Sequence, residues 1–323
     1  LINLGIEEIL LLLPSLRLRI GNRCLPDQMP FERTCTISHL VVVIPVLLVE
    51  HAVLRRKLDA RGFRPNGNDC HGGIGDEDVG VLAFVQHLLG KLQTPEISLV
   101  LLDISNPLLT SAHKHAKEIL GDRVETSMVQ GNFHDLSSYP QATKLDHKVA
   151  GNQKRIYLLM GNTLANLDNE PRFFKYSLTH CENGDFLVID FQQRFCPLNA
   201  SESEIKRCDP ALNNPYPEST ARWLEVPLKA HISDFISSRF ERELSDAQCA
   251  IPGSYMLDNV AIVKTRGKPE KRFSMFRHKR YDEELLRRAL LRFGWECVTT
   301  ISFGPDKSNI AMLLIKRDTN TKH

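Results

Sequence analysis

The sequence lacks an excess of charge of either sign. Its 323 residues include 41 Lys and Arg against 39 Asp and Glu, a formal net charge of +2. A protein that binds nucleic acid along its whole surface needs a basic excess to neutralise phosphates, so that class is not expected. With 42% hydrophobic and 25% charged residues and a mean hydropathy of -0.23, the composition is that of a globular protein. It excludes a disordered or collagen-like chain.

Long hydrophobic runs are also absent. The most apolar stretch, Ile37–Val49, is interrupted by Ser38, His39 and Pro45 and falls short of the ~18–20 apolar residues that span a membrane. The first eight residues carry two acids where a signal peptide has a basic region, and Ile9–Leu13 is too short for its apolar core. We therefore expect Ile37–Val49 to be a core segment, and we expect neither a membrane anchor nor an export signal.

Paired cysteines are missing as well. The eight cysteines form no C-x-x-C pair and show no spacing typical of a zinc site. We interpret them as mostly buried, reduced thiols, which favours a reducing compartment and predicts a cytoplasmic protein. Asn199-Ala-Ser201 spells a glycosylation sequon, which in that compartment is a chance match. His113 and His115 lie two residues apart on an expected helix, so their rings do not share a face and no metal site is predicted.

What the chain does contain, from Glu96 onward, is an alternation of short apolar runs and amphipathic stretches. This pattern is typical of successive βα units around a largely parallel sheet. Strands are expected at 97–103, 123–129, 155–160 and 185–191. Apolar positions at helical spacing predict a helix over 106–120 that ends at Gly121. A helix at 282–293 and two adjoining strands at 296–303 and 309–316 would close the sheet.

The pattern is broken between Gln192 and Lys271, where prolines accumulate. A helix is expected over 221–244 and a hairpin over 256–264 and 271–277. The expected organisation is an unassigned N-terminal segment (1–65), a sheet domain made of 66–191 and 272–323, and an inserted α+β subdomain (192–271).

Ligands of open α/β sheets bind beyond the carboxyl ends of the strands, so the residues there are the first candidates for a site. Asp103 ends its strand, where a carboxylate can accept hydrogen bonds from both hydroxyls of a cofactor ribose; the alternative is a helix N-cap. After the next strand, Phe133 could sandwich an adenine that is read by the Asn132 side chain and the Phe133 amide. The alternative there is a turn with a core Phe.

The third expected strand is followed by Gly161, Thr163 and Asn166. A glycine at this place lets the backbone approach a ligand closely, and the other two residues offer polar groups near it. The alternative is the start of a helix made of small residues.

A glycine cluster further upstream, Gly72-Gly73-Ile74-Gly75, could be the first cofactor loop, with Gly73 and Gly75 against the ligand. The segment before it, 61–70, is polar and contains no strand, and G-x-G-x-x-G is missing, which disfavours a nicotinamide dehydrogenase. Three acids follow at 76–78, before an expected helix at 79–92. They would repel a pyrophosphate and suit a positively charged ligand such as a sulfonium.

Four motifs carry a resemblance to a known family. They are Val100-Leu-Leu-Asp103-Ile-Ser105, Val129-Gln-Gly-Asn-Phe133, Leu159-Met-Gly161-Asn-Thr163-Leu-Ala-Asn166-Leu167 and the closing stretch from Arg280 to Trp295. Between roughly Gly72 and Arg317 the chain resembles the histidine-specific S-adenosylmethionine-dependent methyltransferase family, best known from ergothioneine biosynthesis. The resemblance implies a class I methyltransferase fold, with a Rossmann-like seven-stranded sheet and S-adenosyl-L-methionine as cofactor.

The resemblance also implies roles for the candidate residues. Asp103 would hold the ribose, Asn132 and Phe133 the adenine, and Gly161 and Thr163 would flank the methionine moiety, while Asn166 would touch the acceptor. Where the family usually has Gly-Asp-Phe, this chain has Gly131-Asn132-Phe133, which keeps a hydrogen-bonding group but loses its charge.

The acceptor side departs further from the family, which carries Thr-Glu-x-Ser-x-Lys-aromatic before its last helix, with the Glu and Ser on the imidazole. Aligning the aromatic residue with Tyr281 puts Phe276 and His278 at those two positions. A histidine substrate is therefore not supported, and an acceptor with an apolar or acidic side chain fits as well. The inserted subdomain (192–271) would help to form the acceptor pocket.

The resemblance therefore predicts an S-adenosylmethionine-dependent methyltransferase that N-methylates a small amine or amino acid. No general base is assigned, because enclosure beside a sulfonium lowers the pKa of an amine and the methyl group is already activated. Two alternatives stay open. One is a methyltransferase-like binding or scaffold protein without catalysis; the other is methylation of RNA or protein, which the basic run Lys268–Arg280 motivates. The oligomeric state is open too.

Overall fold

The structure is a computed structural model that describes residues 36–43, 97–104, 106–121, 124–140, 153–216, 218–303 and 308–317. The chain divides into two compact units. The first unit contains residues 1–164, 170–191 and 287–323, and the second contains 165–169 and 192–286. Each is described in turn.

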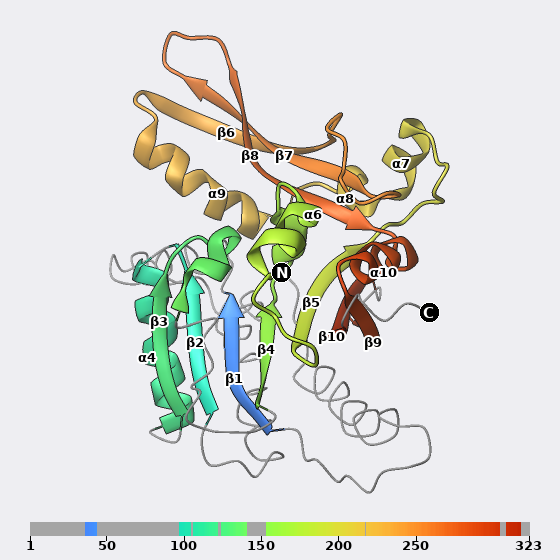
Figure 1. Cartoon of the computed structure of the whole chain (residues 1–323). Coiled ribbons are helices and arrows are strands. Elements are labelled where there is room, and N and C mark those ends of the chain that lie inside the picture. The colour runs from blue at the N-terminus through green and yellow to red at the C-terminus, as the bar shows by residue number, and fades with distance from the viewer. Residues whose placement is uncertain are drawn as a thin grey trace, which may run out of the picture. The chain divides into compact units, whose positions relative to one another are not determined.

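The first unit is built on a sheet of seven described strands (Figure 1). Their order is β3-β2-β1-β4-β5-β10-β9; β1 pairs in parallel with β2 and β4, β2 with β3, and β4 with β5. The last pair, β9 and β10, is antiparallel. The bounds are β1 Thr36–Val43, β2 Ile97–Asp103, β3 Val124–Gln130, β4 Gln153–Leu159, β5 Phe186–Gln193, β9 Trp295–Phe303 and β10 Asn309–Lys316. This strand order is that of the class I methyltransferase sheet, which confirms the expected fold class.

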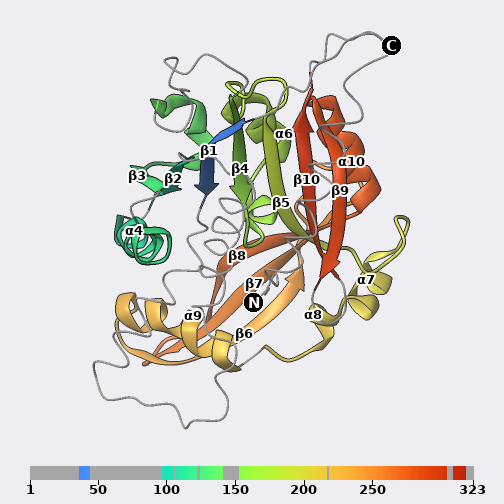
Figure 2. The same ribbon diagram turned by 90° about the horizontal axis from the view of Figure 1, so that it is seen from below.

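The sequence explains why these strands are central. β2 buries Leu99, Val100, Leu101 and Leu102 in succession, so both of its faces are covered, as is usual in parallel sheets. Complete burial of such a side chain contributes roughly 1.5–3 kcal/mol. Seen from below, α4 (Asn106–Leu120) lies beside β2 and β3, whereas α10 (Glu283–Arg292) lies beside β9 and β10 (Figure 2).

The strand β1 adds to what the sequence predicts for the most apolar stretch of the chain. Ile37–Val49 was expected to be a core segment, and Thr36–Val43 is a strand in the middle of the sheet, between β2 and β4. The segment 61–70, which was expected to contain no strand, lies outside the described residues. Gly73 and Gly75 themselves, the acids at 76–78 and the expected helix at 79–92 lie outside the described residues.

The second unit contains an antiparallel sheet of three described strands, in the order β8-β7-β6. The strands are β6 Phe235–Leu244, β7 Tyr255–Thr265 and β8 Lys271–Tyr281. The expected hairpin is thereby confirmed as β7 and β8. The helices are α7 Glu202–Cys208, α8 Pro210–Asn213 and α9 Glu218–His231. α9 packs Leu228 against Ala261 and Val263 of β7.

The helix expected over 221–244 is wrong in its second half. α9 ends at His231, Asp234 adopts a left-handed φ of 61°, and Phe235–Leu244 forms β6. Glu, Arg and Leu are good helix formers, but pairing with β7 along nearly the whole of β6 overrides that preference.

The cysteines also differ from expectation. Of the five that the structure describes, Cys181 and Cys196 are buried, Cys208 is exposed and the other two are partly buried. The prediction of mostly buried thiols is therefore wrong for these five. Within the described ranges, no helix is long and apolar enough to cross a membrane, and no group of His, Cys, Asp and Glu side chains could hold a metal ion.

Candidate functional site

Polar residues gather at the carboxyl ends of the parallel strands in the first unit. Asp103 is the last residue of β2, and its side chain is 2% exposed. Its backbone oxygen accepts a hydrogen bond of 2.9 Å from the amide of Gly131, which follows β3. The ends of β2 and β3 therefore lie together. Because Asp103 lies three residues before the start of α4, it does not occupy the N-cap position of that helix.

Gly131 is a glycine because of a neighbouring tyrosine. A Cβ atom at Gly131 would lie 2.2 Å from the Tyr139 ring, far inside van der Waals contact. The Tyr139 hydroxyl accepts a hydrogen bond of 2.9 Å from the Asn132 amide, which holds the turn after β3. The glycine thus makes room for Tyr139 itself.

Asn132 is partly used by the fold. It is the N-cap of the 3-10 helix η2 (Phe133–Ser138), and its Oδ1 accepts a hydrogen bond of 3.0 Å from the His134 amide. The side chain is exposed, and its Nδ2 group can donate to a ligand. A donor suits the ring nitrogens of adenine and not its amino group.

Phe133 belongs to an aromatic cluster and is partly exposed. Its ring stacks on His134, with centroids 4.6 Å apart, and meets Phe173 edge-on at 6.0 Å. Phe173 lies in the π-helical segment Phe173–Ser177, in which Ser177 donates a hydrogen bond to the His134 carbonyl. The cluster holds the Phe133 ring in one orientation, so a base could stack only on the ring face that His134 leaves uncovered.

The loop after β4 has an unusual backbone. Gly161 and Asn162 both adopt left-handed conformations, with φ of 73° and 63°. Their amides donate hydrogen bonds of 3.1 and 2.8 Å to the two carboxylate oxygens of Asp190. The Oδ1 atom of Asn162 is buried and has no hydrogen-bond partner among the described residues. Left-handed Asn is costly unless its surroundings enforce it, and Asp190 supplies that enforcement.

Asp190 is a residue that sequence reasoning missed. It lies near the carboxyl end of β5 and is 1% exposed. Burial raises the pKa of its carboxyl group to about 7, although the hydrogen bonds from the Asn162 and Gly161 amides oppose that rise. The signal in the sequence was a single acid inside the apolar run Phe186–Phe191.

Thr163 and Asn166 frame the 3-10 helix η3 (Thr163–Asn166). Thr163 is 2% exposed, and its hydroxyl donates a hydrogen bond of 2.6 Å to the Met160 carbonyl, so it supports the loop from inside. Asn166 is partly exposed and belongs to the second unit. The residue after it, Leu167, accepts a hydrogen bond at its carbonyl from the buried Lys279 side chain.

The two acceptor candidates, Phe276 and His278, lie on β8 in the second unit. They are two residues apart and share one face of the strand. Opposite Phe276 on β7 stands Asn259, whose Nδ2 lies 3.0 Å from Nδ1 of His278. Lys279 follows His278 on β8. Because its side chain donates a hydrogen bond to the Leu167 carbonyl, the segment that contains Asn166 is linked to β8.

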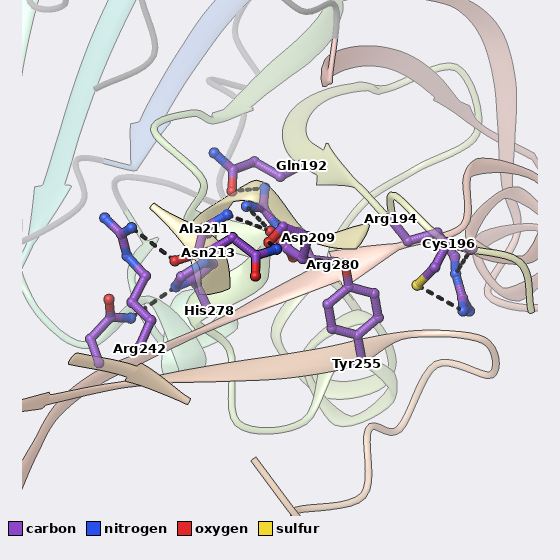
Figure 3. A network of polar contacts seen from close by, with 11 residues as sticks. Gln192, Arg194, Cys196, Asp209, Ala211, Asn213, Arg242, Tyr255, His278 and Arg280 are labelled. Carbon is purple, nitrogen blue, oxygen red and sulfur yellow. Dashed lines mark hydrogen bonds and ion pairs between the residues drawn. The ribbon is translucent and has the colours of Figure 1, made fainter. Parts of the chain in front are cut away.

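A buried charge network lies along the same strand (Figure 3). The guanidinium of Arg280 pairs with Asp209 at 3.2 Å, and Tyr255 donates a hydrogen bond of 2.7 Å to the same carboxylate. Arg280 also donates to the side chain of Gln192. Asp209 is fully buried, so these donors satisfy a charge that would otherwise be expensive to bury. The charge of Arg280 is thereby compensated.

No protein-family model matches the chain, and no curated protein matches it. Solved structures match over most of its length. An S-adenosylmethionine-dependent methyltransferase from Clostridium acetobutylicum is 11% identical with a TM-score of 0.42, covering 87% of this chain and 85% of that one. The methyltransferase CcbJ from Streptomyces caelestis is 12% identical with a TM-score of 0.40, covering 87% and 89%.

A third structure is CalS10, an amino pentose methyltransferase from Micromonospora echinaspora. It is 11% identical to this chain with a TM-score of 0.37, covering 96% of this chain and 91% of that one. Likeness at this level adds nothing to the fold assignment, which rests on the strand order. The resemblance to the histidine-specific family stays a prediction from the sequence motifs.

Proposed function

We propose that the protein is an S-adenosylmethionine-dependent methyltransferase that N-methylates a small amine or amino acid. The observation that carries the proposal is the set of polar groups at the carboxyl ends of β2, β3 and β4 in a sheet of methyltransferase strand order. Because one fold can host many functions, the proposal rests on these polar groups and not on the fold alone.

The residues of the first unit fit the cofactor at three points. The Asp103 carboxylate, at the end of β2, suits the two ribose hydroxyls, and the uncovered face of Phe133 suits the adenine. The buried Oδ1 of Asn162 is an acceptor that the ammonium group of the methionine moiety would satisfy. At Asn132, Nδ2 can donate to the adenine, while Oδ1 already accepts the hydrogen bond that caps η2. Gly73 and Gly75 lie outside the described residues and add no support.

Bound S-adenosylmethionine supplies an activated methyl group, which passes to a neutral amine nitrogen as the carbon–sulfur bond breaks and leaves its electron pair on sulfur. The protein then has to bind, orient and enclose the two reactants. The fixed loop of Gly161 and Asn162 and the ring of Phe133 serve orientation on the cofactor side. Asn166, Phe276 and His278 serve the acceptor in this proposal.

Methylation of RNA is the less favoured alternative, because the basic run of β8 is largely paired. On this exposed face Arg272 binds Glu243, and Arg277 lies 3.4 Å from Asp258. On β6, which is separated from β8 by β7, Arg239 forms a bidentate pair with Glu270 at 2.8 and 2.9 Å. Charges that are compensated in this way release few counterions on binding phosphates.

Titration of variants tests the two sets of residues separately. Asp103→Ala removes the ribose acceptor, and we expect its affinity for S-adenosylhomocysteine to fall at least tenfold, since hydrogen bonds to a charged group contribute about 1.5–3 kcal/mol. Asp135→Ala, an exposed acid on η2, is the matched control. Unchanged affinity of a folded Asp103→Ala protein would remove Asp103 from the site.

Asn166→Ala tests the acceptor side. We expect it to raise the acceptor's KM while leaving S-adenosylhomocysteine binding unchanged, with the exposed neighbour Asp168→Ala as control. An equal loss of cofactor and acceptor affinity would contradict the assignment of Asn166.

A further inference from the structure

The side chain of Asn259, which is 1% exposed on β7, has only one possible orientation. The hydroxyl of Tyr216 donates a hydrogen bond of 3.0 Å to its Oδ1. Its Nδ2 lies 3.3 Å from the carbonyl oxygen of Phe276, which can only accept. The Nδ2 amide therefore points toward β8, and its second proton is directed at His278.

That orientation fixes the tautomer of His278. Because Nδ2 of Asn259 is a donor at 3.0 Å, Nδ1 of His278 must be the acceptor and carries no proton. The neutral ring then bears its proton on Nε2, and no described residue accepts a hydrogen bond from that atom. The residue as a whole is partly exposed. Burial, followed by the charges of Arg280 and Arg242, lowers the pKa of His278 to about 3, in agreement with the neutral form.

Arg242 adds a charge to the same face. It pairs with Asn259 across β6 and β7, and Asn259 pairs with Phe276 across β7 and β8, so the three residues form one row. The half-buried guanidinium lies 4.3 Å above the Tyr216 ring and donates a hydrogen bond of 3.1 Å to the Ala211 carbonyl. Among the described residues no acid forms an ion pair with it, in contrast to Arg239 and Arg280 on the same sheet.

We propose that this face, made by Arg242, Asn259, Phe276 and His278, binds a carboxylate. The inference rests on the proposed function and gives it a substrate class: the acceptor is an amine that also carries a carboxylate group. A guanidinium without an acidic partner attracts an anion, and an open Nε2–H donates a hydrogen bond to one of its oxygens. A cationic group would face the Arg242 charge and a ring nitrogen that cannot accept.

Four probes test the ligand class and its source. Glutamate carries both an α-carboxylate and a side-chain carboxylate, glutamine and isoglutamine each replace one of them by an amide, and putrescine is an amine with no carboxylate. Each is titrated calorimetrically into the protein, with and without saturating S-adenosylhomocysteine. We expect glutamate to bind at least tenfold more tightly than one of the two amides. The carboxylate that this weaker amide lacks is then the one that binds at the face. We expect putrescine not to bind. Equal affinities for glutamate and both amides, absent glutamate binding, or tighter binding of putrescine would overturn the proposal.

Variants connect the binding to this face. Arg242→Met and His278→Phe should each weaken glutamate binding about ten- to a hundredfold, the range for a lost charged hydrogen bond. Arg242→Lys keeps the charge and His278→Gln keeps a donor near the Nε2 position, so both should recover most of the affinity. Arg239→Met is the matched control, an arginine on β6 that is already paired with Glu270. If Arg239→Met loses as much affinity as Arg242→Met, the carboxylate does not bind at this face.

Two further readouts separate the proposal from the function on which it rests. If S-adenosylhomocysteine does not bind but glutamate does, and only the Arg242 and His278 variants weaken it, the carboxylate site stands and the methyltransferase assignment falls. The tautomer is measured independently by nitrogen-15 NMR of the histidine rings at pH 7. We expect the Nε2–H form for His278, and an Nδ1–H form or an imidazolium would contradict the geometry.

Discussion

Asp190 shows what a single buried residue does for the loop beside it. Two consecutive left-handed residues, Gly161 and Asn162, turn their amides toward one carboxylate. Without that acceptor the two amides would lose their partner inside the protein. Asp190 is thus a positioning residue for the loop that follows β4.

Replacement of Asp190 by Ala tests this role. We expect a loss of about 1–3 kcal/mol in the free energy of unfolding, because two donors lose their acceptor. We also expect a weaker affinity for S-adenosylhomocysteine, since the loop is no longer held. Urea unfolding and calorimetry measure the two effects, with Asp135→Ala as the control. A normal stability of Asp190→Ala would show that the two amides find other partners.

The pKa of Asp190 makes this role dependent on pH. Its folded pKa, about 7, lies above the ordinary carboxyl value of 3.8, so the folded state binds more protons. The stability linked to this group is fully present below pH 3.8 and is lost as pH rises through 7. The difference in unfolding free energy between wild type and Asp190→Asn should change across that interval. A constant difference from pH 5 to 8 would contradict the raised pKa.

At the scale of elements, one buried ion pair ties β4 to the segment that leads into β5. Arg155 on β4 pairs with Asp185 at 2.7 Å, and both side chains are buried. The backbone amides of Arg155 and Glu182 also donate to the Asp185 carboxylate. The carboxylate therefore organises the start of the β4–β5 pairing.

Removal of that carboxylate should be far more damaging than removal of the neighbouring exposed one. We expect Asp185→Ala to cost about 3–5 kcal/mol, since it removes the buried partner of the buried Arg155 charge and leaves the exposed Glu182 in its place. Glu182→Ala removes the second, exposed partner of Arg155, 3.5 Å away, and should cost less than about 1 kcal/mol. Chemical unfolding of both variants measures the contrast, and similar losses would contradict it.

The elements themselves could be predicted where sequence and environment agree. β2, α4 and β10 have the expected bounds. In these segments an unbroken apolar run indicates a buried strand, and apolar residues at helical spacing indicate a helix. β6 could not be predicted, because residues 235–244 have helical character and become a strand only through β7. β1 was recognised as core, but its place in the middle of the sheet depends on pairing partners that are distant in sequence.

The candidate site shows the same limit. The residue types at the strand ends could be read from the sequence, as at Asp103 and Gly161, because the end of a parallel strand is a local feature. The partners could not be read: Tyr216, Arg242 and Asn259 come from separate elements and meet only in the fold. The same holds for Asp190 and the loop after β4.

For the molecule as a whole, the lowered pKa values of two histidines predict that the folded state loses stability in acid. Burial lowers the pKa of His180 to about 4, and its Nε2 lies 2.8 Å from the Tyr157 hydroxyl. His278 is lowered to about 3. Both folded values lie below the ordinary 6.5, so the folded state binds fewer protons, and stability falls as pH drops from 6.5 toward 4. Between pH 6.5 and pH 4, the free energy of unfolding should fall more steeply with decreasing pH for the wild type than for His278→Gln. Equal slopes of the two curves would contradict a neutral His278.

The central claim is that the sheet binds S-adenosylmethionine, and calorimetric titration of the purified protein tests it most directly. S-adenosylmethionine and S-adenosylhomocysteine are the ligands, and NAD, which shares the adenosine moiety, is the control. We expect saturable binding of the first two and a much weaker response to NAD. Absence of binding by a sample whose fold is verified by circular dichroism would contradict the claim and favour a methyltransferase-like protein without catalysis.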